Sequence, residues 1–226
     1  LLFDGVIASA DYHHVEQKLL EKPFRNYSIE YWQSREMSPS SLLFYVGVDK
    51  RLNNLQHHNL FFDADFDQHA KEIYDNPKWP KNPLFYLSCP SITDPSLAPK
   101  GNENLMFLIP LAPGLEDTNE MREKYFDIVL KRLKDLTGND IEKNIIFKKS
   151  YCVNDFEKDY NSFKGNAYGL ANTLRQTAVL KPRMKNKKIK NLYYTGQLTV
   201  PGPGVPPSII SGQIAAIEID KYLNKL

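Results

Sequence analysis

One stretch near the end of the chain constrains the fold most strongly. A short apolar run at residues 192–195 is followed by a loop rich in glycine and proline, and then by an apolar periodic segment over about 206–223. This order predicts a buried strand, a loop and a helix. The first turn of a helix carries unpaired N–H groups and partial positive charge, and Gly202 and Gly204 allow close approach to the backbone. The stretch therefore predicts a site for an electron-rich ligand.

The remainder of the chain predicts an α/β (α+β) fold. Apolar and β-branched runs separated by turn residues indicate strands at 6–8, 42–48, 60–62, 84–88, 105–109 and 145–153. The irregular connections among the middle four favour a mostly antiparallel or mixed sheet. Every position of 42–46 is apolar, which predicts a strand covered on both faces. One of these faces could line an apolar cavity or belong to the ordinary core.

Two helices have clear start signals. Asp11 can cap a helix that continues until Pro23 stops the pattern. A capping-box pattern at 117–120 precedes the clearest amphipathic helix, which Gly138 is expected to end. The apolar face of this helix is predicted to comprise Met121, Tyr125, Ile128, Val129, Arg132, Leu133 and Leu136.

Composition excludes several classes of protein. With 226 residues, 42% of them hydrophobic, the chain can form one large or two small domains with a sizeable core. Its 29 basic and 27 acidic residues give a net charge of +2 and no reason to expect a nucleic-acid partner. Cys89 and Cys152 are too few for a disulfide framework, so a reducing compartment and core positions are expected. No apolar run reaches the length of about 18 residues that a membrane span needs.

Two pairs of adjacent histidines do not predict a metal site. His57 and His58 lie in an extended segment, where neighbouring side chains are expected to point to opposite faces. His13 and His14 are neighbours on a helix, where consecutive side chains do not face each other. No further histidine or cysteine completes a ligand set, so no metal is expected.

Residues 181–190 carry six basic side chains in ten positions. Such a run is typical of a solvated loop. The alternative is a patch for anionic lipid headgroups, to which each basic side chain near the surface adds about 1 kcal/mol.

The segment Gly202-Pro-Gly204-Val-Pro-Pro207 nearly matches the dinucleotide fingerprint G-x-G-x-x-G between a strand and a helix. Pro207 replaces the third glycine, and the residues about twenty positions later remain in the helix, so no second strand can present an acidic group to a ribose. Gly196, by contrast, lies directly at the strand end. This arrangement favours a cofactor held at its ring over one held at its pyrophosphate.

Several segments in series resemble the bacterial-type carotenoid (phytoene) desaturases, of the FAD-dependent amine-oxidase-like superfamily. Residues 196–206 with Ser211-Gly212 are similar to the C-terminal flavin motif of this family. The other similar segments are Ala8–Asp11, Ser40–Asp49, His57–Phe62, Thr93–Pro99 and Gly165–Leu170 with Gln176, in family order. The resemblance covers essentially the whole chain and corresponds to the C-terminal half of the family, without the N-terminal dinucleotide-binding segment. The chain also departs from the family at Val200, where many members have histidine, and at Pro203 and Pro207.

This resemblance implies part of a Rossmann-like FAD-binding domain, formed by 1–11 and 185–226, and a mixed-sheet substrate domain at 12–184. Because 6–8 is typical of a strand that begins with the chain already under way, we expect residues before Leu1 to be missing.

The resemblance also implies a flavin site. Gly196 and Gln197 would lie beside the ribityl chain of FAD, and the backbone N–H groups of Gly204, Val205 and Ser208 would approach the pyrimidine edge. Pro206 belongs to the same motif but cannot donate a hydrogen bond. A helix N-terminus at this edge would stabilise the negative charge of the reduced flavin.

The implied reaction is FAD-dependent desaturation of a carotene such as phytoene, with a quinone or oxygen as electron acceptor. Phe44 and Tyr168 would line a tunnel for the polyene or pack in the core, and no residue stands out as a catalytic acid or base. The protein would be cytoplasmic and peripheral on the inner face of the cell membrane. The alternatives are a flavin-dependent carotene isomerase or saturase, and a non-catalytic fragment or binding module.

Overall fold

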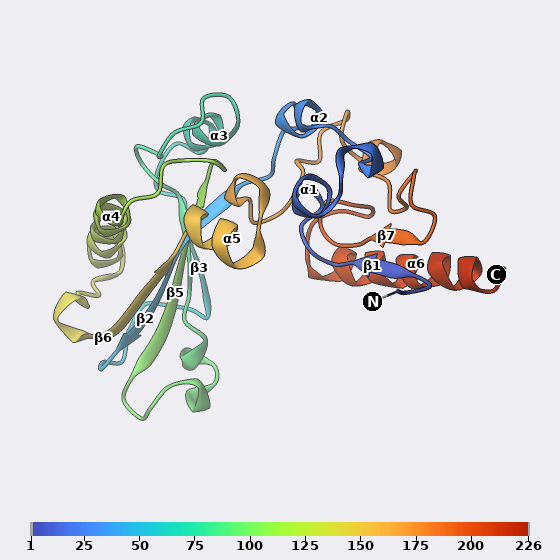
Figure 1. The fold of residues 1–226 in the computed structure, drawn as a ribbon. Helices are drawn as coiled ribbons and strands as arrows, with labels where there is room; N and C mark the ends of the chain where they lie inside the picture. The colour runs from blue at the N-terminus through green and yellow to red at the C-terminus, as the bar shows by residue number, and fades with distance from the viewer. Residues whose placement is uncertain (1, 226) are drawn as a thin grey trace. The chain divides into compact units, whose positions relative to one another are not determined.

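The computed structural model describes residues 2–225, which form two compact units (Figure 1). The central unit is Ser40–Asn154, and the terminal unit combines the chain up to Pro39 with the chain from Asp155 onward. The sequence predicted different boundaries, with 12–184 as one domain. Residues 12–39 and 155–184 instead pack with the two ends of the chain, because a second hydrophobic cluster joins Tyr12 and Trp32 to Leu192 and Tyr194. The assignment of the units to flavin and substrate remains a prediction.

The central unit contains one five-stranded sheet with the order β3-β4-β5-β2-β6, in which all the described pairs are antiparallel. Its strands are β2 (Ser40–Val48), β3 (His58–Phe61), β4 (Phe85–Ser88), β5 (Glu103–Leu111) and β6 (Ile145–Tyr151). All five were predicted from sequence, with ends that differ by at most two residues. The unit also contains α3 (Phe66–Tyr74) and α4 (Asn119–Thr137).

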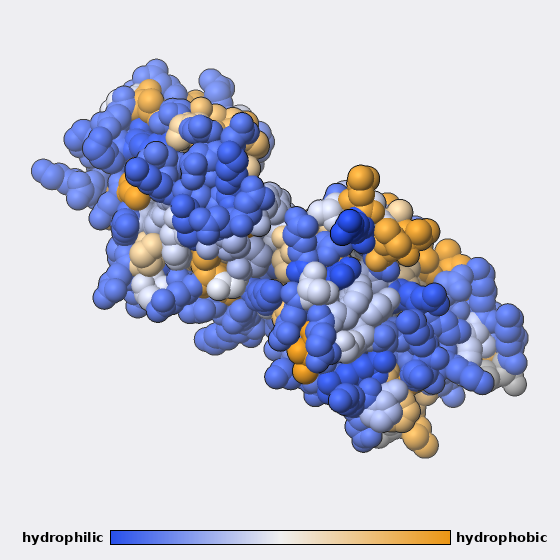
Figure 2. All heavy atoms as spheres, turned by 90° about the horizontal axis from the view of Figure 1, so that it is seen from above, coloured by the Kyte–Doolittle hydropathy of each residue, from blue (hydrophilic) through white to orange (hydrophobic). Residues whose placement is uncertain are grey.

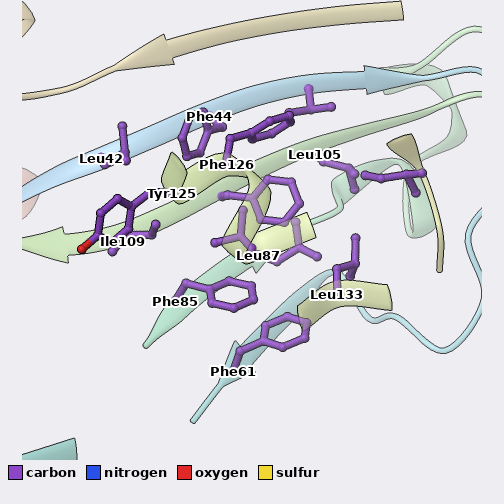
Figure 3. Packing of buried hydrophobic residues seen from close by; sticks show 14 of the residues in the cluster. Leu42, Phe44, Phe61, Phe85, Leu87, Leu105, Ile109, Tyr125, Phe126 and Leu133 are labelled. Atoms are coloured by element: carbon purple, nitrogen blue, oxygen red, sulfur yellow. The ribbon is translucent and has the colours of Figure 1, made fainter. Parts of the chain in front are cut away.

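Alternate residues of the sheet pack against α4 and form the core of the central unit (Figure 3). Phe44 on β2 is fully buried, and its ring centroid lies 4.8 Å from that of Phe126 on α4. Truncating a phenylalanine in such a core to alanine typically costs about 3–5 kcal/mol. The buried face of α4 consists of Tyr125, Phe126, Val129 and Leu133.

Two sequence predictions about this core were wrong. Leu136 was assigned to the buried face of α4 but is 53% exposed, whereas Phe126 was missed. Strand β2 was expected to be covered on both faces, yet Tyr45 is 42% exposed. The physical reason is that α4 packs on one face of the sheet, so the apolar residues of the opposite face remain partly accessible.

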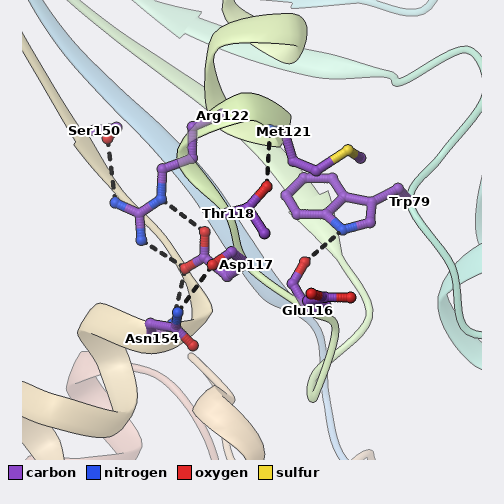
Figure 4. Close-up of polar contacts among 8 residues, drawn as sticks. All are labelled: Trp79, Glu116, Asp117, Thr118, Met121, Arg122, Ser150 and Asn154. Atoms are coloured by element: carbon purple, nitrogen blue, oxygen red, sulfur yellow. Dashed lines mark hydrogen bonds and ion pairs between the residues drawn. The ribbon is translucent and has the colours of Figure 1, made fainter.

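Helix α4 is capped at both ends, but not by the first residue of the predicted capping box. The Oγ1 atom of Thr118 accepts a hydrogen bond from the Met121 amide at 3.2 Å, and Gly138 ends the helix with a left-handed φ of 78°. Asp117 is instead paired with Arg122, at 2.7 Å from its Nε, and accepts a hydrogen bond from the Asn154 amide (Figure 4).

The terminal unit contains a parallel pair of strands, β1 (Val6–Ala8) and β7 (Leu192–Tyr194), beside the long helix α6 (Val205–Leu223) (Figure 1). All three elements agree with the sequence prediction to within one residue. The predicted N-cap is also confirmed, because the Asp11 carboxylate accepts a hydrogen bond from the His14 amide at 3.0 Å. Further helices are α1 (Tyr12–His14), continued by a π-helix at Val15–Leu19, and α2 (Ile29–Gln33), while α5 (Val153–Tyr160) begins at the end of the central unit.

Hydrophilic residues cover much of the surface seen in Figure 2, and apolar residues form separate groups on it. None of the helices within residues 2–225 is both long enough and apolar enough to cross a membrane. Cys89 and Cys152 are buried in the core of the central unit, as predicted.

Candidate functional site

A pocket of about 610 Å³ opens in the terminal unit where β1 and β7 end. Parallel strands place their carboxyl ends at the same edge of a sheet, which is where ligands bind in open α/β folds. The pocket is lined by the residues that follow the two strands, by the end of α5 and the loop after it, and by the first turn of α6. They include Ser9, Ala10, Asp11, Asn166, Ala167, Thr195, Gly196, Gln197, Leu198 and Ser208.

Gly196 and Gln197, both predicted from the flavin motif, lie in this pocket. Gly196 has a φ of 100°, which favours glycine, and its amide donates to Ser211 Oγ at 2.8 Å. The Gln197 side chain donates to Asn166 Oδ1 at 3.3 Å. Ser211 Oγ in turn donates to the Ser208 carbonyl at 2.6 Å, so hydrogen bonds connect the end of β7 to the first turns of α6.

The start of α6 offers fewer backbone donors than the sequence suggested. Gly204 is the N-cap, with a φ of 106°. The Ser208 amide donates to the Gly204 carbonyl at 3.0 Å, so the expected Ser208 donor is already used by the helix itself. Pro206 lacks an N–H group. Within residues 2–225, no hydrogen bond is found from the amides of Gly204 and Val205, which are thus the two donors left at this end.

The structure therefore brings together three of the six predicted flavin residues. Gly196, Gln197 and Ser208 line the pocket, whereas Gly204, Val205 and Pro206 are exposed and lie outside its lining.

Lys181 is a residue of this region that sequence reasoning missed. Its side chain is only 4% exposed, and its Nζ atom has no hydrogen-bond partner within the part of the chain that the structure describes. Burial lowers the pKa of this amine. An ideal Cβ atom on Gly202 would lie 3.5 Å from Lys181 Nζ, so the ammonium group faces the loop before α6. In the sequence, Lys181 is the first of six basic residues in 181–190, and nothing in the pattern distinguishes it from the other five.

Asp11 is one of the two aspartates that line the pocket. Burial raises the pKa of Asp11, and hydrogen bonds from the His14 and Phe163 amides act in the opposite direction. Because its two oxygens accept these bonds, Asp11 serves as a structural cap that joins α1 to the segment after α5.

The two predicted substrate residues lie in different environments. Phe44 is inside the core between the sheet and α4, so its position favours core packing over substrate contact. Tyr168 is 44% exposed, and its neighbour Ala167 lines the pocket.

The sheet face opposite α4 presents an apolar row that crosses all five strands. Register pairs connect the members of this row, which are Leu60, Tyr86, Leu108, Leu43 and Tyr151. A neighbouring hollow of about 330 Å³ is lined mainly by apolar atoms of Tyr45, Gly47, Met106 and Phe147. We call this surface the open sheet face. Strand alternation puts Phe44 and Tyr45 on opposite faces, but the apolar pattern of 42–46 does not say which face α4 covers.

One argument about the histidines was wrong. The rings of His57 and His58 lie 4.2 Å apart and do not point to opposite faces, because His57 precedes β3 and is not held by strand alternation. His57 Nδ1 is hydrogen-bonded to Thr93 Oγ1 at 2.7 Å, and His58 Nδ1 is hydrogen-bonded to Tyr86 Oη at 2.6 Å. Residues 2–225 contain no cluster of three or more His, Cys, Asp or Glu side chains placed to hold a metal.

Apart from Lys181, the basic residues of 181–190 are exposed. Two of them also lie over aromatic rings: Lys185 Nζ is 5.3 Å from the ring centroid of Tyr193, and Lys187 Nζ is 5.3 Å from that of Tyr27.

No family model matches the chain, but curated proteins do. A carotenoid 3,4-desaturase of Haloarcula japonica is 44% identical over 213 residues, which are 94% of this chain and 43% of that protein. Two 4,4'-diapophytoene desaturases (4,4'-diaponeurosporene-forming) are also similar. The enzyme of Staphylococcus haemolyticus is 34% identical, over 95% of this chain and 44% of its own length. The enzyme of Staphylococcus aureus strain MRSA252 is 29% identical, over 99% of this chain and 46% of its own length.

Among solved structures, an oxidoreductase from Methanosarcina mazei superposes with a TM-score of 0.55 at 14% sequence identity. The superposition covers 96% of this chain and 43% of that protein, and it supports the fold alone. The chain spans less than half the length of each of these relatives.

Proposed function

Because this chain is homologous to carotenoid desaturases over nearly its whole length, we place it in their family and propose that the protein containing it desaturates a carotene with a bound FAD. The observation that carries the proposal is the 44% identity to the carotenoid 3,4-desaturase over 94% of the chain. The activity, substrate and partners of the whole protein are proposed, since the chain corresponds to less than half of that relative.

The geometry of the terminal unit supports a flavin site. Gly196, Gln197 and Ser208 line a pocket at the ends of two parallel strands, and the Gly204 and Val205 amides make no hydrogen bond within residues 2–225 that would compete with a ligand. The unit would then be part of a Rossmann-like FAD-binding domain. A bound flavin would accept the hydrogen removed from the polyene, while these residues would hold its ribityl chain and the edge of its ring at the start of α6.

The open sheet face is proposed to bind the polyene. Adjacent strands are about 4.8 Å apart, so the apolar row across five strands extends for roughly 19 Å. A row of this length suits a long, flat hydrocarbon. Tyr45, which lies on this face and is 42% exposed, replaces Phe44 as the residue that we expect to contact the substrate.

A polyene dissolves in lipid, so we propose that the protein acts at the cytoplasmic face of a membrane, with the exposed basic residues of 183–190 toward anionic headgroups. A quinone or oxygen would take the electrons. The alternative is that the same flavin fold isomerises or saturates a carotene. Analysis of the products would distinguish these reactions from desaturation.

The test uses the full-length protein with FAD and lipid-dispersed carotenes under air or with an added quinone. Desaturation extends the conjugated system, so the absorbance of the extracted product should shift to longer wavelength. A product with unchanged conjugation but altered geometry would indicate isomerisation, and a shift to shorter wavelength would indicate saturation. A full-length protein that binds no flavin would contradict the proposal.

A pair of variants tests the open sheet face. Tyr45→Asp should reduce carotene conversion at least tenfold, because a carboxylate on this face would be desolvated by the polyene. Tyr74→Asp is the matched control, since Tyr74 is 46% exposed, close to the 42% of Tyr45, and ends helix α3 outside the sheet. If the two variants have equal thermal stability and convert carotene equally well, the proposal that the polyene binds the open sheet face is wrong.

A further inference from the structure

We propose that Lys181 supplies the positive charge that faces the electron-rich edge of the flavin across the Gly202 loop, and so helps to set the flavin's reduction potential. This inference rests on the proposed flavin site. It gives a role to a lysine that neither the sequence motifs nor the hydrogen bonds among residues 2–225 explain.

The first step is the environment of the ammonium group. Lys181 is 4% exposed, and its Nζ atom finds no hydrogen-bond partner within residues 2–225. The other basic residues of 181–190 are exposed to solvent, so burial distinguishes Lys181 within its own run. An unpaired buried cation is unfavourable, and lysine almost never occupies such a place without a counter-charge. A ligand that carries negative charge would satisfy it.

The second step is the direction of the side chain. Gly202 is buried and has a φ of 136°, and a Cβ atom there would lie 3.2 Å from Lys181 Cε and 3.5 Å from Nζ. The same Cβ would lie 3.8 Å from Asn172 Oδ1. Glycine thus leaves room for the ammonium group directly against the loop that leads into α6.

The third step is the sum of the charges at this loop. Beyond Gly202, the amides of the N-cap Gly204 and of Val205 stand at the start of a helix of 19 residues, and they make no hydrogen bonds within the described chain. The helix N-terminus contributes about half a positive charge, and Lys181 adds a full one. Flavin gains negative charge at N1 and C2=O when it is reduced, so a cation here favours the reduced form over the oxidised form.

The experiment compares full-length wild type with Lys181→Met, which keeps the length of the side chain and removes its charge. We expect the reduced flavin to lose about tenfold more affinity than the oxidised flavin. For a two-electron couple this is a fall of about 30 mV in the midpoint potential, measured by spectroelectrochemistry. Lys188→Met is the matched control, because it removes the same charge from an exposed position of the same run and should leave the potential unchanged.

A second measurement does not depend on loaded enzyme. In flavin-free protein, Lys181→Met should raise the melting temperature, because it replaces an unpaired buried charge by an apolar group. Adding FAD should then stabilise the variant less than it stabilises the wild type. A lysine that merely supports the fold would give a lower melting temperature when it is replaced. A lysine that faces a ligand should give a higher melting temperature without FAD and a smaller gain in melting temperature when FAD is added.

The outcomes separate this inference from the function on which it rests. If wild type binds no flavin, the proposed function fails. If wild type binds flavin and Lys181→Met leaves both the potential and the affinity unchanged, only the role of Lys181 fails. If the variant weakens the binding of oxidised and reduced FAD equally, Lys181 contacts a phosphate and not the ring, which also overturns the inference.

Discussion

Gly169 packs directly against the loop that follows β7, and only a residue without a side chain fits there. It has a φ of 78°, and a Cβ atom at this position would lie 2.8 Å from the Gln197 carbonyl oxygen. Its amide donates to Asn166 Oδ1 at 2.6 Å, the same atom that receives the Gln197 side chain. The backbone at Gly169 is thus packed directly against the predicted flavin motif.

We expect Gly169→Ala to destabilise the full-length protein by about 2–4 kcal/mol. Roughly 1 kcal/mol comes from the left-handed backbone and about 1–3 kcal/mol from the contact with Gln197. Gly101→Ala is the matched control, since Gly101 has a φ of 89° and a Cβ atom there would have no other atom within 4 Å. Chemical denaturation of both variants isolates the contact, and equal losses would show that the Gln197 loop moves away without cost.

At the level of elements, Asp117 connects three parts of the central unit (Figure 4). Its fully buried carboxylate pairs with Arg122 on α4 and accepts the Asn154 amide at the start of α5. Arg122 also donates to Ser150 on β6 at 3.2 Å. Nearby, the Trp79 indole donates to the Glu116 carbonyl at 2.9 Å, which holds the segment before α4.

Asp117→Ala should lower the free energy of unfolding by about 3–5 kcal/mol, because it removes the buried carboxylate that pairs with the largely buried Arg122 and accepts the Asn154 amide. Asp135→Ala removes an exposed i,i+4 pair with Lys131 on the same helix and should cost about 0.5 kcal/mol or less. Urea unfolding of the two variants makes the comparison. A loss of under 1 kcal/mol for Asp117→Ala would mean that water replaces the network.

At the scale of the whole molecule, the proposed membrane contact depends on the exposed part of the basic run. Lys187 and Lys188 are both exposed, whereas Lys181 points inward and contributes nothing to the surface. The chain as a whole is nearly neutral, with a net charge of +2, so attraction to lipid would come from this local cluster.

Reversing Lys187 and Lys188 to glutamate should weaken binding to vesicles of anionic lipid at least about tenfold, since each basic residue contributes about 1 kcal/mol. Wild-type binding should also fall as salt rises. Reversing Lys71 and Lys100, which are exposed in the central unit, makes the same change in net charge and serves as the control. If the two double variants bind anionic vesicles equally well, residues 181–190 form a solvated loop and do not bind the membrane.

The sequence by itself determined the elements around the candidate site. The strands at 6–8 and 192–194, the helix at 205–223 and the glycine end of α4 were all predicted, because their signals are local: apolar periodicity, caps and residues suited to left-handed backbone. The series of motifs likewise pointed to the carotenoid desaturases, and the relatives agree.

Only the tertiary structure decided what each side chain faces. Phe44 and Tyr45 are adjacent aromatic residues of one apolar strand, and the packing of α4 on one face buries the first and exposes the second. Lys181 and Lys188 belong to one basic run, yet the fold places Lys181 against Gly202 and leaves Lys188 in solvent. Burial depends on residues that are distant in the chain, and a local pattern does not contain them.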